Sequence, residues 1–110
     1  MTNIFAWVLQ VLLALAFLGA GGSKVAGAAQ MVEMFGKIGV GQWFRYVTGF
    51  LEIAGAIGIL IPRTRFYSAL LLAAVMVGAI IAHLTLVGGN PTPPIVLLVM
   101  AATVAYLRQP

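Results

Sequence analysis

Residues 66 to 87 read FYSALLLAAVMVGAIIAHLTLV, and this run contains no Asp, Glu, Lys or Arg. As a helix it is about 33 Å long at 1.5 Å per residue. The hydrocarbon core of a bilayer is about 30 Å thick, so one such helix can cross it. The run therefore predicts a transmembrane helix, bounded by the polar turn at residues 62 to 65 and by the Gly-Gly-Asn-Pro sequence at residues 88 to 91.

The composition of the whole chain agrees with this prediction. Of its 110 residues, 63% are hydrophobic and only 7% are charged, whereas a soluble domain of this size needs a charged surface. The net charge of +4 does not indicate nucleic-acid binding, because the basic residues stand beside apolar runs, where they anchor helix ends and meet anionic lipid. The chain has no cysteine, which excludes disulfides and thiolate sites. We expect one domain over residues 1–110, surrounded by membrane lipid.

Three further apolar runs occupy residues 4–22, 43–61 and 93–107. The first resembles a signal peptide, but it lacks a basic start and a clear cleavage site, so an uncleaved helix is preferred. The last rises only about 21 Å, so three spans with a re-entrant segment are the alternative. The expected fold class is all-α, an integral membrane four-helix bundle with spans at 4–22, 43–61, 66–87 and 93–107.

Residues 28–38 differ from the spans because they are amphipathic. The apolar side chains recur with helical spacing at Met31, Met34, Phe35 and Ile38. Glu33 and Lys37 fall on the opposite face, four residues apart. This pattern predicts a short helix between the first two spans, lying at the membrane surface or capping the mouth of the bundle.

Four spans place both termini on one side of the membrane. That side carries three basic residues, Arg63, Arg65 and Arg108, and the other side carries Lys24, Lys37 and Arg45. Although the positive-inside count is nearly equal, we expect a multi-pass protein of the cytoplasmic membrane with both termini cytoplasmic.

Only two ionisable side chains, Glu52 and His83, lie well inside the predicted spans, where such groups are costly and need a reason. Glu52 is about 13 Å from Trp43 along its helix, and His83 is about 6 Å from the end of its own helix on the same side. Arg45 shares a helix face with Glu52 because the two are seven residues apart.

Lys24 enters the same half of the membrane from the first span. We therefore expect Lys24, Arg45, Glu52 and His83 to converge beneath residues 28–38. The other half, toward the turn at residues 62 to 65, is expected to be plainly apolar.

Small residues mark the faces expected to pack. Gly49, Gly55, Ala56 and Gly58 flank Glu52, and Ala74, Gly78 and Ala82 repeat every four residues. Such patterns allow close approach of helices in lipid. They favour helix packing within the bundle and self-association into a homo-oligomer.

The polar cluster is compatible with three functions. It can lock the helices of an accessory or scaffold subunit, with Glu52 paired to Arg45 or hydrogen-bonded to His83. It can form the polar end of a pocket for a lipophilic molecule such as a quinone, lined also by Trp43 and Met76. It can also belong to a membrane enzyme in which Glu52 and His83 are catalytic. No metal site is expected, because one His and one Glu are too few ligands.

The chain resembles the DoxX-like family of small membrane proteins. The matching motifs are GAGGSK at residues 19 to 24, RYVTGFLEIAGAIG at residues 45 to 58, LIP at residues 60 to 62, and His83. The resemblance implies a four-helix bundle in a bacterial inner membrane. Some members belong to redox systems, including a quinone-reducing thiosulfate oxidoreductase and a complex that handles oxidative stress, and a related eukaryotic protein looks like a receptor-assembly chaperone.

Members that act through thiol partners often carry cysteines, which are missing here. We expect an accessory or scaffold subunit of a membrane system. The resemblance implies that this system can be a quinone-linked redox one, with another membrane or redox protein as a partner. The lipophile binder and the enzyme are the alternatives.

Overall fold

The computed structural model describes residues 2–110, which form helices joined by short turns. In chain order the helices are α1 (Thr2–Ala26), α2 (Ala29–Ile38), α3 (Trp43–Gly58), α4 (Arg65–Ala82), the π-helical turn η1 (His83–Val87) and α5 (Thr92–Leu107). The described residues contain no strand, which confirms the predicted all-α class.

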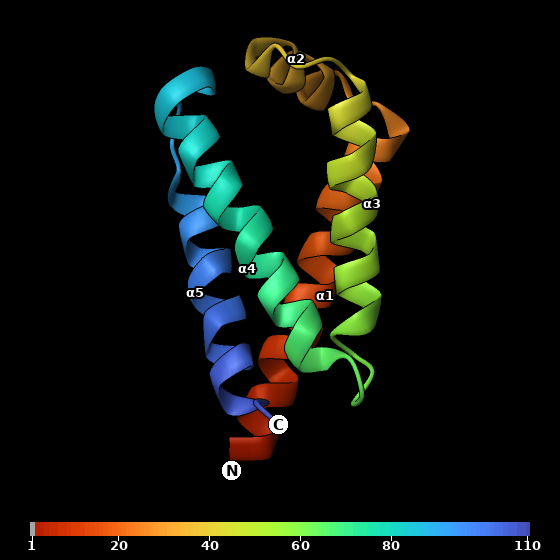
Figure 1. The fold of residues 1–110 in the computed structure, drawn as a ribbon, viewed down its shortest axis with the longest axis vertical. Coiled ribbons are helices and arrows are strands. Elements are labelled where there is room, and N and C mark those ends of the chain that lie inside the picture. Colours follow the sequence, from red (N-terminus) through yellow and green to blue (C-terminus); the bar gives the residue numbers. More distant parts are fainter. Residues whose placement is uncertain (1) are drawn as a thin grey trace.

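The helices are arranged as two pairs, α1 with α3 and α4 with α5 (Figure 1). The pairs pack together at the end of the molecule where both termini lie, and they diverge toward the other end. There α2 crosses the wide end and contacts both η1 and α3. The molecule measures 42 × 24 × 18 Å, with the four long helices running along its longest dimension.

The core lies where the two pairs meet. Its fully buried side chains include Leu13 and Phe17 of α1, Leu72 of α4 and Val104 of α5. Ile59, just after α3, completes the group. All four long segments contribute to this core, so it holds the two pairs together at the end near the termini. Toward the other end the pairs separate.

Within residues 2–110, two helical segments are long and apolar enough to cross a membrane, Thr2–Ala26 and the continuous segment Arg65–Val87. α5 is apolar but shorter, and α3 has 16 residues. Large apolar side chains are exposed on the outer faces of these helices, for example Leu15, Ile57 and Val99. An outer surface of this kind is suited to contact with lipid.

The ends of three helices differ from the predicted spans. α3 ends at Gly58, three residues before the predicted end at residue 61, because the turn that leads to α4 begins there. α1 continues four residues past Gly22 to Ala26 and ends before Gly27, whose φ of +77° lies outside the right-handed helical region. α4 changes at His83 into a π-helical turn, in which the Gly88 N–H donates to the His83 carbonyl at 2.9 Å. Such turns are frequent at functional sites.

Candidate functional site

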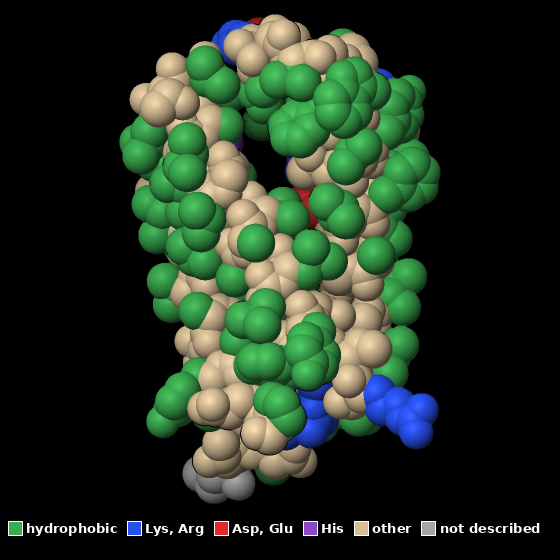
Figure 2. Space-filling model, in the orientation of Figure 1, with side chains coloured by type: hydrophobic (Ala, Val, Ile, Leu, Met, Phe, Trp, Pro, Cys, Tyr) green, Lys and Arg blue, Asp and Glu red, His purple; other side chains and the backbone are tan. Residues whose placement is uncertain are grey.

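A cavity of about 640 Å³ lies between the two helix pairs, beneath α2. Side chains from all five α-helices and from η1 line it. Figure 2 shows the molecule hollowed in this region, with an acidic side chain at the edge of the hollow. The cavity exists because the pairs diverge above the core, so the space between them is left unfilled.

The amphipathic helix α2 covers the wide end of this cavity. Its apolar side chains Met31, Met34, Phe35 and Ile38 all belong to the lining. Phe35 is buried and packs edge-on against Phe44 of α3, with ring centroids 5.9 Å apart. The sequence left open whether this helix lies at the membrane surface or caps the mouth of the bundle. In the structure α2 caps the mouth between the helix pairs.

The small residues of α4 serve the cavity rather than a helix contact. Ala74, Gly78 and Ala82 all line it, and a Cβ atom added at Gly78 would meet nothing within 4 Å. The prediction that this stripe packs against another helix within the bundle is wrong. Because the side chains are short and the helix pairs diverge here, the stripe gives the cavity its volume.

The glycines of α3 do pack closely. An added Cβ at Gly49 would lie 3.0 Å from the Gly21 carbonyl oxygen of α1, and one at Gly55 would lie 2.6 Å from Leu72 of α4. These contacts draw α3 against both neighbours, as small residues do at helix interfaces in lipid.

The polar part of the cavity wall contains a buried ion pair. Lys24 Nζ of α1 lies 2.6 Å from Glu52 Oε1 of α3, and the side chains are 11% and 1% exposed. Among the described residues, no other group donates a hydrogen bond to Glu52 Oε1. The Lys24 ammonium is therefore the counterion of this carboxylate, and both side chains line the cavity.

Arg45 does not contact Glu52. Seven residues separate them along α3, about 10 Å of helix rise. The buried Arg45 guanidinium donates instead to the Lys24 carbonyl and, through Nε, to Gln42 Oε1 at 2.9 Å. It also lies over the Tyr46 ring, 4.3 Å from its centroid. Arg45 thus holds the carboxyl end of α1 against the start of α3, which positions Lys24.

His83 lines the cavity from the junction of α4 and η1. Its Nδ1 lies 2.9 Å from the Ala79 carbonyl oxygen. Because a carbonyl can only accept, Nδ1 carries the proton in the neutral imidazole and Nε2 is left as an acceptor. This contact is made instead of the hydrogen bond to Glu52 that the sequence suggested.

Of the other two residues predicted to line a pocket, one does and one does not. Met76 is buried and lines the cavity. Trp43 lies outside it, 59% exposed, and its Nε1 donates to the Val40 carbonyl at 3.1 Å. Its ring also packs edge-on against Phe44, with ring centroids 5.7 Å apart, and stays outside the cavity. Within residues 2–110, no three His, Cys, Asp or Glu side chains come close enough to hold a metal ion.

The model of the DoxX-like family matches residues 8–106, nearly the whole chain. The chain belongs to the DoxX-like family. The resemblance seen in the sequence is thus confirmed, and family membership together with the two long apolar helices indicates a small membrane protein. No curated protein and no solved structure matches the chain.

A second polar network in this DoxX-like protein was missed by the sequence analysis. Gln10 of α1 is completely buried, and its Nε2 donates to the Ile59 carbonyl at 2.6 Å. Arg108 Nε donates to Gln10 Oε1 at 2.9 Å, and a second Arg108 nitrogen reaches the Asn3 carbonyl at 3.4 Å. The prediction that this half is plainly apolar is therefore wrong. The sequence feature that could have indicated this network is Gln10 itself, the single long polar side chain inside the first apolar run.

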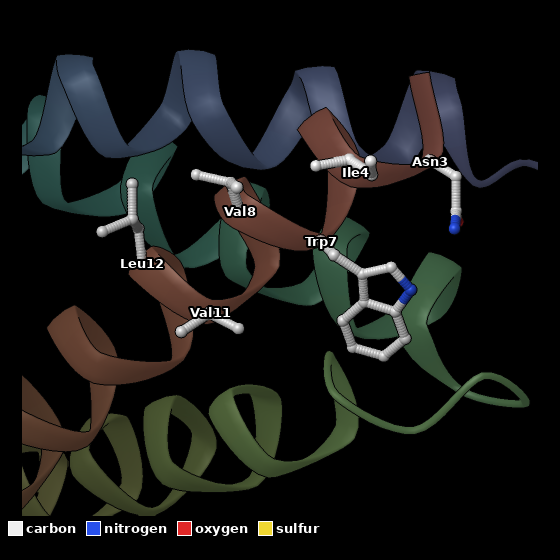
Figure 3. A pocket seen from close by; sticks show the side chains of 6 residues that line it. All are labelled: Asn3, Ile4, Trp7, Val8, Val11 and Leu12. Carbon is white, nitrogen blue, oxygen red and sulfur yellow. The ribbon is translucent and has the colours of Figure 1, made fainter. Parts of the chain in front are cut away.

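A second hollow, of about 400 Å³, lies on the outer face of α1 (Figure 3). Its walls are two rows of side chains spaced four residues apart, with Ile4, Val8 and Leu12 in one and Trp7 and Val11 in the other. Asn3 closes the end nearest the N-terminus. The hollow is an apolar groove on the surface, separate from the cavity beneath α2.

Proposed function

We propose that this DoxX-like protein binds a lipophilic molecule with a polar head group, of the quinone type, in the cavity beneath α2. The observation that carries the proposal is an otherwise apolar cavity of about 640 Å³ whose wall contains a buried ion pair and a histidine. Ligand pockets typically enclose about 300–1,000 Å³ and combine an apolar lining with a few polar groups.

The polar groups suit both redox forms of such a head group. The Lys24 ammonium can donate to a carbonyl oxygen. Glu52 and, in the neutral imidazole, Nε2 of His83 can accept from a hydroxyl. A bound quinone would supply reversible transfer of two electrons and two protons. The residues of the chain would hold the head group, and the methionines of α2 would adapt to its shape, as flexible thioethers do.

For the membrane we propose that α1, α3, α4 with η1, and α5 form a four-helix bundle of transmembrane spans. Both termini then lie on one side and α2 on the other, and we assign the termini to the cytoplasmic face of a bacterial inner membrane. Support comes from the apolar outer surface and from the position of both termini at one end of the molecule.

The accessory role inferred from the sequence fits this function if the ligand is shared with a partner redox protein or between copies of the chain. The cavity favours ligand binding over a purely structural role for the polar cluster, because the Lys24–Glu52 pair faces unfilled space. A cluster that only locks helices together needs no such space.

The test is titration of the purified protein in detergent with a short-chain quinone, followed by thermal unfolding. A ligand that binds only the folded state at 100 times its Kd stabilises by about 2.7 kcal/mol, so the wild type should show a clear rise in Tm. Gly78→Leu, which fills the cavity, should lose the rise, and the matched control Gly19→Leu, outside the cavity and equally free of clashes, should keep it. Equal responses of the two variants would contradict the proposal.

A further inference from the structure

We propose that the groove on the outer face of α1 is a binding site for an anionic phospholipid, with the phosphate held by Arg65 and Arg108 and one acyl chain lying along the groove. This site is at the opposite end of the molecule from the cavity beneath α2. The inference rests on the membrane placement proposed above but not on the proposed ligand.

Two guanidinium groups gather at a single indole ring. The Cζ atoms of Arg108 and Arg65 lie 5.7 Å and 6.0 Å from the centroid of Trp7. Arg65 is the first residue of α4, and Arg108 directly follows α5. The fold therefore brings two cations, 43 positions apart in the sequence, to one face of α1.

The chain provides these two cations with no acidic side chain. Its only acids are Glu33 and Glu52, and they pair with Lys37 and Lys24, away from the end where the termini lie. Among the described residues, neither Arg65 nor Arg108 forms a salt bridge. Two guanidiniums without a counterion favour an anion from outside the chain, and arginine suits phosphate because it can donate two parallel hydrogen bonds.

The guanidinium of Arg108 is held in place before any ligand arrives. Its Nε donates to Gln10 and another nitrogen to the Asn3 carbonyl. The buried amide of Gln10 is itself fixed by the Ile59 carbonyl. Because these contacts restrict the side chain, less conformational entropy is lost when a phosphate binds.

The apolar groove starts beside the same indole. It offers a place for an acyl chain next to the anion, which favours a lipid as the ligand. It runs from Asn3 and Trp7 along α1 to Leu12, about 14 Å of helix rise. If the end with the termini lies at the membrane surface, where Trp is favoured, the groove leads from the head-group level toward the bilayer centre. Phosphate contacts at its start and an apolar trough along its length match the two parts of one phospholipid.

The experiment measures lipid retained by the full chain in detergent, using native mass spectrometry after incubation with dioleoyl phosphatidylglycerol, dioleoyl phosphatidylcholine or inorganic phosphate. The wild type should retain phosphatidylglycerol in preference to phosphatidylcholine. Arg65→Gln should weaken this preference about fivefold, the effect of one basic residue near a membrane surface. The matched variant Arg63→Gln, exposed in the same turn, should preserve it.

A second variant tests the groove without removing a charge. Val8→Trp, at a half-exposed position, fills the groove and should abolish retention, whereas Val99→Trp, exposed on α5 outside the groove, should not. Equal retention of the two lipids by the wild type, or equal effects of Arg65→Gln and Arg63→Gln, would overturn the proposal. Retention of inorganic phosphate alone, unaffected by Val8→Trp, would also overturn it, because the site would then hold an anion without a lipid chain.

Discussion

Lys24 of α1 and Glu52 of α3 meet at 2.6 Å in the wall of the cavity. The pair joins the two helices of one half of the molecule and does not reach α4 or α5. It is therefore placed to stabilise the α1–α3 pair beside a space that the other pair leaves open. A buried pair of this kind can be structurally important and still be accessible to a ligand.

The first prediction concerns this ion pair. Glu52→Gln should lower the free energy of unfolding by about 3–5 kcal/mol, because it leaves the Lys24 ammonium buried without a counterion. Unfolding in mixed micelles measures the change, and Glu33→Gln is the control, since the exposed Glu33–Lys37 contact of 3.8 Å should be worth less than about 1 kcal/mol. The double variant Lys24→Met/Glu52→Gln should be less destabilised than the sum of the two single variants. Similar effects of Glu33→Gln and Glu52→Gln would show that the pair is not formed.

The second prediction compares two adjacent glycines of α1. A Cβ added at Gly21 would lie 2.7 Å from the Gly49 carbonyl oxygen, but one added at Gly22 would meet nothing within 4 Å. Gly21→Ala should therefore destabilise the protein by about 1–3 kcal/mol through overpacking. Gly22→Ala should stabilise it by up to about 1 kcal/mol, because alanine is the better helix former. Unfolding curves of both variants test the difference in sign, and the same sign in both would contradict the close approach of α1 and α3.

The third prediction concerns Gln10. Gln10→Leu removes the partner of the Ile59 carbonyl and of Arg108 Nε, and it should cost about 1–3 kcal/mol of stability through unsatisfied polar groups. The control Gln30→Leu, at an exposed position of α2, should change stability by less than about 0.5 kcal/mol. If both substitutions have the same small effect, the network near the termini contributes nothing measurable.

Much of the fold could be predicted from the sequence because apolar periodicity and length determine helices strongly. The apolar run at residues 66 to 87 forms α4 together with η1. The i, i+3, i+4, i+7 pattern of residues 28–38 forms α2. Helix rise also placed Glu52 and His83 in the same half of the membrane, since that depends only on their distances from the helix ends, and both line the cavity beneath α2. The family could be recognised from the motifs at residues 19–24 and 45–58. These motifs contain the glycines that pack α3 against α1 and α4.

Partners and orientations could not be predicted in the same way. Helical spacing placed Arg45 and Glu52 on one face of α3, but they are too far apart along the helix to touch. Glu52 pairs instead with Lys24, a residue of another helix. The use of Ala74, Gly78 and Ala82 as cavity wall depends on the divergence of α4 from α3, which no local pattern encodes. Gln10 escaped notice because one amide hardly changes an apolar run, and its partners Ile59 and Arg108 lie 49 and 98 positions away.

The most direct test of the central claim is mass spectrometry of organic extracts from protein purified gently from its native membrane. For the wild type and for Gly19→Leu, we predict one lipophilic compound of the quinone class at a near-stoichiometric amount, in addition to phospholipid. For Gly78→Leu, which fills the cavity from a position with free space around it, the compound should be lost while the protein remains folded. Phospholipid alone in the wild-type extract, or the same compound at equal amounts in all three proteins, would contradict the account.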